Sequence, residues 1–184
     1  MTASTSHDII TDATYFEGKL RWNEGKESIL AENIITAIFA PGDGYEHIIC
    51  TLTSTDEEPF KLRILPAKTL PQDFLDEHEL KQLPAHFGPA HADLYVFVSK
   101  TSGTGLSTRF FDEVLEPLIR VAGIQASEYQ VIRTEDVESI TKHTRAELLN
   151  GAKSGRKQTV LLLSGDGGIV EIINGLLRQE EPQV

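Results

Sequence analysis

The stretch that decides the fold is residues 159–177, which read TVLLLSGDGGIVEIINGLL. An unbroken apolar run at residues 160–163 has the length of a buried strand. A loop with three glycines follows at residues 164–168. Apolar residues then return at helical spacing, at Ile169, Ile172, Ile173 and Leu176. This order predicts a strand, a tight turn and a helix. The first N–H groups of such a helix lack partners and attract an anion, so the turn is a candidate phosphate site.

The Gly-Asp-Gly triplet is weak evidence by itself, because the chain holds a second copy at residues 42–44 between two apolar runs. There we expect a hairpin turn, with glycine supplying positive φ and Asp43 bonding its own backbone. The copy at residues 165–167 differs in its context. A buried strand precedes it, and the helix that follows carries Glu171 and Asn174 on its polar side.

The composition argues against several classes of function. The 184 residues include 17 basic and 28 acidic side chains, and the resulting charge of −11 argues against a nucleic-acid partner and against simple attraction to anionic lipid. A single cysteine, Cys50, permits no internal disulfide and fits a reducing compartment. We find neither a secretory signal pattern nor an apolar run of about 18 residues. These features predict a cytoplasmic protein; peripheral membrane contact and the oligomeric state stay open.

The pattern along the chain predicts four segments. We expect a flexible tail at residues 1–12, a β-rich region closed by a helix at 13–88, a nucleotide-binding lobe at 89–178 and a tail at 179–184. In the first region, residues 14–22 alternate as one half-buried strand, with Phe16, Leu20 and Trp22 on one face. The other expected elements there are a hairpin at 33–40 and 45–53, a strand around 60–64 and a helix at 71–83.

After residue 89 the pattern changes to alternating strands and helices, which predicts an α/β fold with a parallel sheet. Strands are expected at residues 94–98, 129–133 and 160–163, and helices at 137–149 and from 169 onward. A further helix is predicted from apolar residues that share one face, at Phe110, Phe111, Val114, Leu115 and Leu118. The loops at 99–107, 134–136 and 164–168 would then meet at the carboxyl edge of the sheet, where ligands of such folds gather.

Two features of that edge could hold phosphate. Thr101-Ser102-Gly103-Thr104-Gly105 follows a strand and opens a helix, although it matches neither a Walker loop nor a dinucleotide fingerprint, and a plain connection is the alternative. Asp166 has two interpretations. It is either a helix cap, or an acid that binds magnesium through water or accepts a proton from a reacting hydroxyl.

Other polar residues give weaker signals. The six histidines show no close pair at metal-ligand spacing, so no metal site is predicted from protein side chains. Glu171 and Asn174 share a helical face near the loop, and simple exposure is their alternative. The basic turn at residues 151–157 lies at the opposite end of the last strand, and we interpret its charges as solvated.

Ser164-Gly165-Asp166-Gly167, with Glu171-Ile172-Ile173-Asn174-Gly175-Leu176 at close fixed spacing, resembles the signature of the diacylglycerol kinase catalytic family, especially its sphingosine (sphingoid long-chain base) kinase branch. The loop at residues 102–105, the helix around residues 111–118 and Thr134-Glu135 are also similar and follow in the family's order. The resemblance covers residues 94–177.

The resemblance implies an ATP-dependent lipid kinase that uses ATP with Mg²⁺, with a sphingoid base or diacylglycerol as lipid substrate. It assigns Asp166 as the base that activates a lipid primary hydroxyl. The nucleotide contacts that it implies are Ser99, Ser102, Gly103, Thr104, Gly105, Thr134, Ser164, Gly165, Gly167 and Glu171.

The chain departs from the family pattern in several places. Ser99-Lys100 replaces an Asn-Pro opening, Thr104 and Leu106 replace basic residues, and Gly168 replaces a common threonine; Lys100 would compensate in part for the lost charge. The lipid-binding lobe of the family has no match after Leu177, so we expect a truncated nucleotide-binding lobe that is inactive alone. The alternatives are a non-catalytic remnant that serves as a binding or regulatory module, and an NAD-kinase-like enzyme with a soluble substrate.

Overall fold

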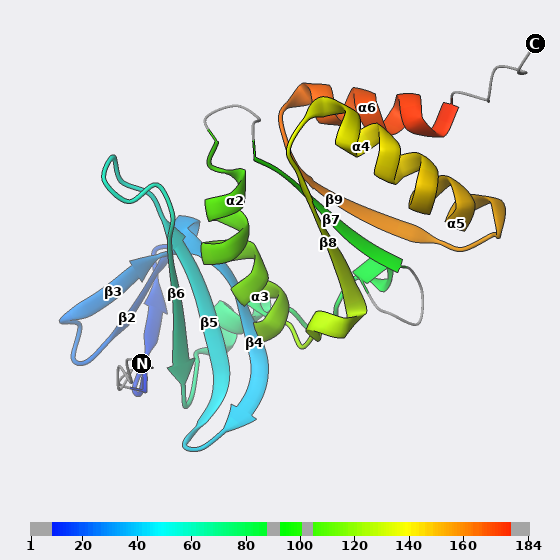
Figure 1. Cartoon of the computed structure of the whole chain (residues 1–184). Coiled ribbons are helices and arrows are strands. Elements are labelled where there is room, and N and C mark those ends of the chain that lie inside the picture. Colours follow the sequence, from blue (N-terminus) through cyan, green and yellow to red (C-terminus); the bar gives the residue numbers. More distant parts are fainter. Residues whose placement is uncertain (1–8, 88–92, 101–104, 178–184) are drawn as a thin grey trace, which may run out of the picture. The chain divides into compact units, whose positions relative to one another are not determined.

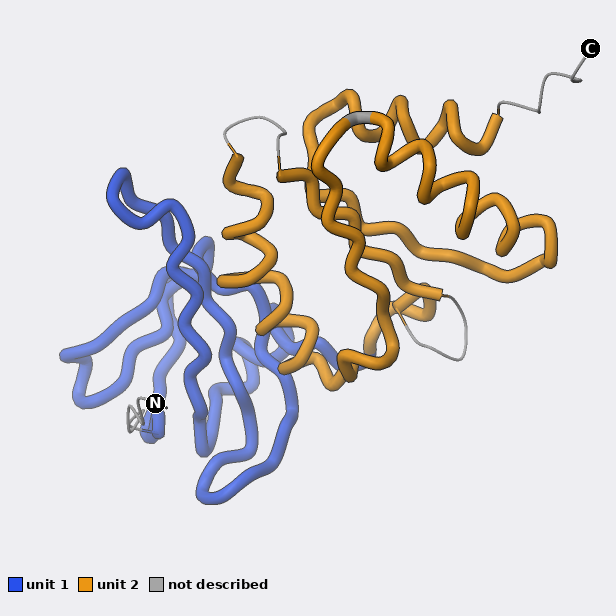
Figure 2. Tube along the Cα trace, in the orientation of Figure 1, with its two compact units in different colours: residues 1–82 blue, residues 83–184 orange. Residues whose placement is uncertain are grey.

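A computed structural model describes residues 9–87, 93–100 and 105–177. The chain divides into two compact units, Met1–Gln82 and Leu83–Val184 (Figure 2). Unit 1 is antiparallel β structure with one helix, and unit 2 is a parallel sheet with helices. The mixed α/β fold class expected from the sequence is confirmed.

Unit 1 contains two three-stranded antiparallel sheets (Figure 1). The first sheet is formed by β1 (Thr14–Phe16), β2 (Lys19–Trp22) and β3 (Glu27–Leu30). After the short helix η1 (Ala31–Asn33), the second is formed by β4 (Ile34–Gly42), β5 (Tyr45–Thr53) and β6 (Lys61–Ala67). The expected hairpin around the first Gly-Asp-Gly triplet is confirmed, because β4 and β5 pair with Gly42 opposite Tyr45.

The helix α1 (Gln72–His78) packs on the core of unit 1 through Phe74, which is fully buried among residues such as Leu20, Ile49 and Leu65. The ring of Tyr15 meets Phe74 edge to face, with 5.4 Å between ring centroids. The Tyr15 hydroxyl donates to Glu77 at 2.6 Å, and this hydrogen bond, with burial, raises the pKa of Tyr15 to about 12.

Two expectations for unit 1 are wrong. Residues 14–22 form a hairpin and not one strand, because Glu17 and Gly18 have positive φ of 50° and 66°, as in the type I′ turns that favour two-residue hairpins. Phe16 is consequently exposed. The helix expected at 71–83 ends at His78, because Glu79 is extended and bridges Ala37 in β4.

Unit 2 is built on three parallel strands in the order β8-β7-β9. They are β7 (Asp93–Ser99), β8 (Tyr129–Thr134) and β9 (Gln158–Leu163), and the short helices η2 (Ala85–Phe87) and η4 (Ala126–Glu128) precede β7 and β8. The central strand alternates between two cores. Leu94, Val96 and Val98 pack with Phe111 on one face, and Tyr95 and Phe97 pack on the other.

A continuous helix follows β7 and contains a π-helical turn. Its parts are α2 (Ser107–Phe110), the π turn η3 (Phe111–Leu115) and α3 (Glu116–Val121). Pro117 has no N–H for the preceding turn, and a wider turn accommodates its ring. The turn shifts the buried face by one residue, so Ile119 is buried where Leu118 was expected.

The helix on the opposite face is longer than predicted. It consists of α4 (Val137–His143), the π turn η5 (Thr144–Leu148) and α5 (Leu149–Lys153). Gly151, expected to open a turn, is buried in the last helical turn, where a Cβ would overlap the side chain of Gln158. With the final helix α6 (Asp166–Leu177) on this same face, unit 2 has three layers (Figure 1).

Candidate functional site

The carboxyl ends of the three parallel strands lie at one edge of the sheet. Ser99, the last residue of β7, pairs with Thr134, the last residue of β8, and Val98 pairs with Leu163 at the end of β9. The chain segments that leave these strands therefore start side by side. Ser102, Gly103 and Thr104, which were predicted to contact nucleotide, lie outside the described residues.

The turn after β9 is two residues long. Ser164 and Gly165 connect β9 to α6, which begins at Asp166, so Gly167 and Gly168 belong to its first turn and not to the loop expected there. The N–H of Gly168 donates to the carbonyl of Gly165 at 3.0 Å. A Cβ on Gly168 would lie 2.5 Å from Ser164 Oγ and 2.7 Å from its Cβ. Glycine at 168 therefore provides space for a sharp bend.

Asp166 is exposed at the start of α6. Within the described part of the chain, its carboxylate has no hydrogen bond or ion pair, so it does not cap the helix as the simpler interpretation required. The first N–H groups of a helix have no carbonyl partner in a preceding helical turn. A carboxylate and these donors thus lie together at the sheet edge.

Ser99 and Thr134 lie under this edge rather than on it. Ser99 is 6% and Thr134 is 1% exposed, and the hydroxyl of Thr134 has no hydrogen-bond partner in the structure. Buried hydroxyls seldom remain unpaired, so a ligand or water completes such a site. Gly105 is exposed with a φ of 72°, a backbone conformation that favours glycine.

Glu171 points to the neighbouring helix, where it accepts a hydrogen bond from the hydroxyl of Thr141 in α4. It is half-buried, whereas Asn174 is exposed. Gly175 of α6 is buried against η5, where a Cβ would lie 2.6 Å from Thr144. Three of the apolar residues that predicted the helix face solvent instead: Ile169, Ile173 and Leu176.

The edge carries more negative than positive charge. Lys100 is the one cation in the described parts of the three strand-to-helix connections, which also contain Glu135 and Asp136, and Asp166 follows the third connection as the first residue of α6. Lys100 Nζ lies 2.7 Å from Glu135 Oε1, and this hydrogen bond holds the pKa of Glu135 below its usual range. Asp136 caps α4 by accepting from Ser139 N–H at 2.7 Å, and its hydrogen bonds to Ser139 lower its pKa.

The Lys100–Glu135 pair was not predicted. A usable signal was present, because residues of opposite charge directly follow two strands that the fold makes neighbours. The basic turn lies at the opposite end of the sheet. There Arg156 pairs with Asp93 at 2.9 Å, away from the candidate site.

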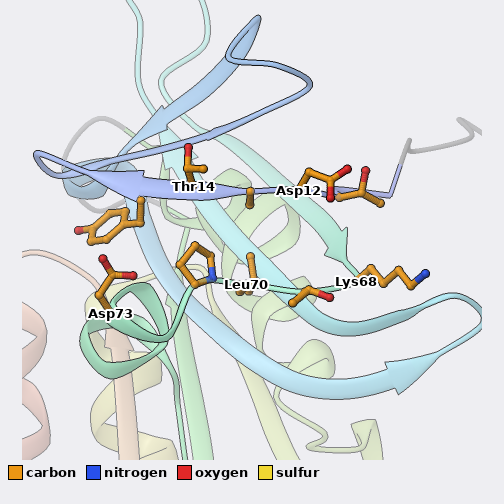
Figure 3. A pocket seen from close by; sticks show the side chains of 10 residues that line it. Asp12, Thr14, Lys68, Leu70 and Asp73 are labelled. Atoms are coloured by element: carbon orange, nitrogen blue, oxygen red, sulfur yellow. The ribbon is translucent and has the colours of Figure 1, made fainter.

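A pocket of about 740 Å³ opens in unit 1 between the segment before β1 and the segment between β6 and α1 (Figure 3). The two segments start together, since Lys68 N–H donates to the Ile10 carbonyl, and then diverge around the pocket. Its lining includes apolar Leu70 and charged Asp12, Lys68 and Asp73. None of the predicted site residues lines it.

Metal-binding clusters and membrane-spanning helices are both missing from the described residues. No three side chains of His, Cys, Asp or Glu come together there in an arrangement suited to a metal ion. Nor does any helix formed by these residues combine the length and the apolar character needed to cross a bilayer.

Comparisons with known proteins place this site in a family. The model of the diacylglycerol kinase catalytic domain matches residues 93–184. Sphingosine kinase 1 of Caenorhabditis elegans is 35% identical over 89 residues, which are 48% of this chain and 17% of that protein. Sphingoid long-chain bases kinase 1 of Arabidopsis thaliana is 29% identical over 90 residues, 49% of this chain and 11% of that protein.

The chain thus spans less than a fifth of the length of these curated relatives. No solved structure matches significantly. The matched region begins with β7 and contains the whole parallel sheet, the turn at Gly165 and α6. The chain belongs to the diacylglycerol kinase catalytic domain family.

Proposed function

We propose that this chain supplies the nucleotide-binding lobe of an ATP-dependent lipid kinase that phosphorylates a sphingoid base or diacylglycerol. Family membership supports a kinase. The names of the two relatives favour a sphingoid base as acceptor. The observation that carries the proposal is the turn between β9 and α6, where the first turn of a helix and the unpaired Asp166 carboxylate lie together at the sheet edge.

In this proposal the backbone N–H groups after Gly165 bind phosphate oxygens, and the helix dipole of α6 adds to the attraction. Ser99, Gly105, Thr134, Ser164 and Gly167 contribute further nucleotide contacts, together with Ser102, Gly103 and Thr104. The hydroxyl of Thr134 gains the partner that it lacks in the structure. Glu171, held by Thr141, contributes to the same site from α6.

Asp166 is proposed as the proton acceptor. The primary hydroxyl oxygen of the lipid forms a bond to the γ-phosphorus of ATP while the bond from that phosphorus to the β–γ bridging oxygen breaks. ADP leaves, and the hydroxyl proton passes to the Asp166 carboxylate. A carboxylate is a weak base, so in this proposal Asp166 takes the proton late in the transfer, as in protein kinases.

Mg²⁺ fits the residues present. It is usually held by one or two carboxylates together with substrate phosphates, and Asp166 supplies an unpaired carboxylate beside the proposed phosphate site. A bound Mg²⁺ would neutralise phosphate charge during transfer. Glu135 and Asp136 are already engaged, by Lys100 and by the α4 cap respectively, so the alternative to Asp166 as proton acceptor is Asp166 as a ligand of Mg²⁺ through water.

Titration of the isotopically labelled 184-residue chain with Mg-ATP tests the proposal. Amide shift changes confined to the loops around Gly103, Thr134 and Gly165 would support it. Asp166→Asn should alter the Mg²⁺ dependence of these changes, whereas Asp43→Asn in the other Gly-Asp-Gly triplet should leave them unchanged. Silence of all three loops at millimolar Mg-ATP would refute nucleotide binding.

One observation favours a second candidate, a non-catalytic remnant with a binding or regulatory role. The described connections at the edge, together with the first residue of α6, contain three carboxylates and one lysine, and that lysine is already paired. Such an excess of negative charge opposes the binding of a nucleotide, which is itself an anion. The same titration separates the two, because a remnant would show no shift. The NAD-kinase alternative has no comparable support, since both named relatives are sphingoid-type kinases.

A further inference from the structure

The ion pair between Lys100 and Glu135 joins the ends of two neighbouring strands. Lys100 directly follows β7 and Glu135 directly follows β8. The backbone N–H of Lys100 donates to the Thr134 carbonyl at 3.0 Å, which continues the pairing of the two strands by one residue. The register of the sheet therefore fixes the backbone of Lys100 at the carboxyl edge.

The side chains of this ion pair are accessible to solvent and can take other partners. The side chain of Lys100 is 45% exposed and that of Glu135 is 76% exposed, and exposed ion pairs contribute little to stability. An ammonium group has three donors, so Lys100 can reach an additional acceptor without leaving Glu135. Glu135, in contrast, is an acceptor only and repels any anion that approaches the same ammonium group.

Electrostatics gives Lys100 particular weight. It is the one cation in the described parts of the three connections, whereas Glu135 and Asp136 in the second connection and Asp166 at the start of α6 are acidic. The four residues of the loop at 101–104 are uncharged. A phosphate chain arriving at this edge therefore depends on Lys100, on backbone donors and on a divalent cation for compensation of its charge.

We propose that Lys100 is a phosphate ligand at this edge and that Glu135 competes with the phosphate for its ammonium group. This inference rests on the proposed nucleotide-binding function. The ligand class is a polyphosphate that carries a divalent cation, because the edge has too little positive charge of its own for a bare polyphosphate. Glu135 thereby limits the affinity of the site.

Calorimetric titration of the full chain with Mg-ATP and with Mg-tripolyphosphate tests this assignment. Lys100→Gln should weaken both ligands about tenfold, the effect expected for loss of one charge-assisted hydrogen bond, and Lys100→Arg should retain most of the affinity. Glu135→Gln should tighten both ligands. Arg156→Gln, which breaks an ion pair of similar exposure at the opposite end of the sheet, is the matched control and should change nothing.

The opposite signs of the two substitutions distinguish a ligand from a structural link. If the pair only ties the two connections together, Lys100→Gln and Glu135→Gln will weaken binding alike. Binding by the wild-type chain that Lys100→Gln leaves unchanged would overturn the role of Lys100 and leave the proposed function standing. Absence of binding in both the wild-type chain and Glu135→Gln would overturn both proposals.

Discussion

Gly-Asp-Gly occurs once in each unit, and the two copies have different structures. In unit 1, Asp43 and Gly44 turn the chain between antiparallel β4 and β5, and Gly44 has a φ of 83°. In unit 2, Asp166 and Gly167 open α6 after a parallel strand, and neither glycine of that triplet has positive φ. Gly44 of the first copy therefore provides a left-handed backbone conformation, whereas the glycines of the second copy lie at the start of a helix and do not adopt it.

The surrounding structure explains this difference. β4 is followed by a strand that pairs with it directly, so the turn has only to reverse the chain. β9 is followed by a helix that must pack back on the sheet, and Gly168 gives the space that this bend requires. The comparison shows that a short motif acquires a function only from the elements on either side. Four experiments test this conclusion.

The largest expected effect concerns the two aspartates. In the longest expressible form of the chain that phosphorylates lipid, Asp166→Asn should lower kcat by about 100-fold or more, the usual contribution of a proton acceptor. Asp43→Asn should leave kcat unchanged, because the first triplet is an ordinary turn. Lipid phosphorylation with radiolabelled ATP measures both variants. Full activity of Asp166→Asn would remove Asp166 from the role of base.

Gly168→Ala should give the largest effect on stability, a loss of about 2–3 kcal/mol from overpacking at a rigid site. The new methyl group would meet the Ser164 Cβ at 2.7 Å, close to the backbone, where little can move. The free energy of unfolding in urea measures the loss. Adding Ser164→Gly removes the obstructing atoms, so the double variant should lose less than the sum of the single ones.

Gly167→Ala is the matched control for Gly168→Ala. Nothing lies within 4 Å of a Cβ at Gly167, and its φ is not positive. Alanine there should be neutral or stabilise by up to about 1 kcal/mol, the difference in helix propensity. A large loss of stability in Gly167→Ala would show that the space around each Cβ does not explain the difference between the two glycines.

Gly44→Ala in the first triplet should cost about 1–2 kcal/mol, because its left-handed backbone strains any side chain with a Cβ. Gly42→Ala should cost less. Its Cβ would meet the outer ring atoms of Tyr45, which can rotate away. Thermal unfolding of both variants checks this order. A larger loss at Gly42 than at Gly44 would show that crowding, and not φ, limits the first turn.

The smallest expected effect is a pH dependence beside the second triplet. The hydrogen bond from Lys100 lowers the pKa of Glu135 in the folded chain. The contribution of this pair to stability is therefore present above the ordinary glutamate pKa and is lost as the pH falls through the lowered one. Carboxyl carbon shifts should show Glu135 titrating below its usual range. In Lys100→Gln the pKa of Glu135 should return towards the ordinary value. An unchanged pKa in this variant would show that Lys100 is not the cause of the lowered pKa.

The sequence predicted the elements whose signals are local. The apolar run at residues 160–163 and the glycines after it specify strand, turn and helix, and the parallel sheet follows from alternating strands and helices. The order of acidic, amide and glycine residues on the last helix also identified the family. These features need no knowledge of distant contacts, because backbone geometry and side-chain periodicity act within a few residues.

Only the tertiary structure decided which of several locally possible arrangements the chain adopts. Alternation at residues 14–22 fits one strand or a hairpin, and the antiparallel pairing of β1 with β2 selects the hairpin. The spacing on α6 predicts an apolar face in the core, yet Gly175 allows that helix to approach α4 and η5 through one of its smallest residues. The Lys100–Glu135 pair likewise exists because the sheet register aligns two strand ends that are 35 residues apart in sequence. Sequence determines local conformation, whereas packing and register determine which side chains meet.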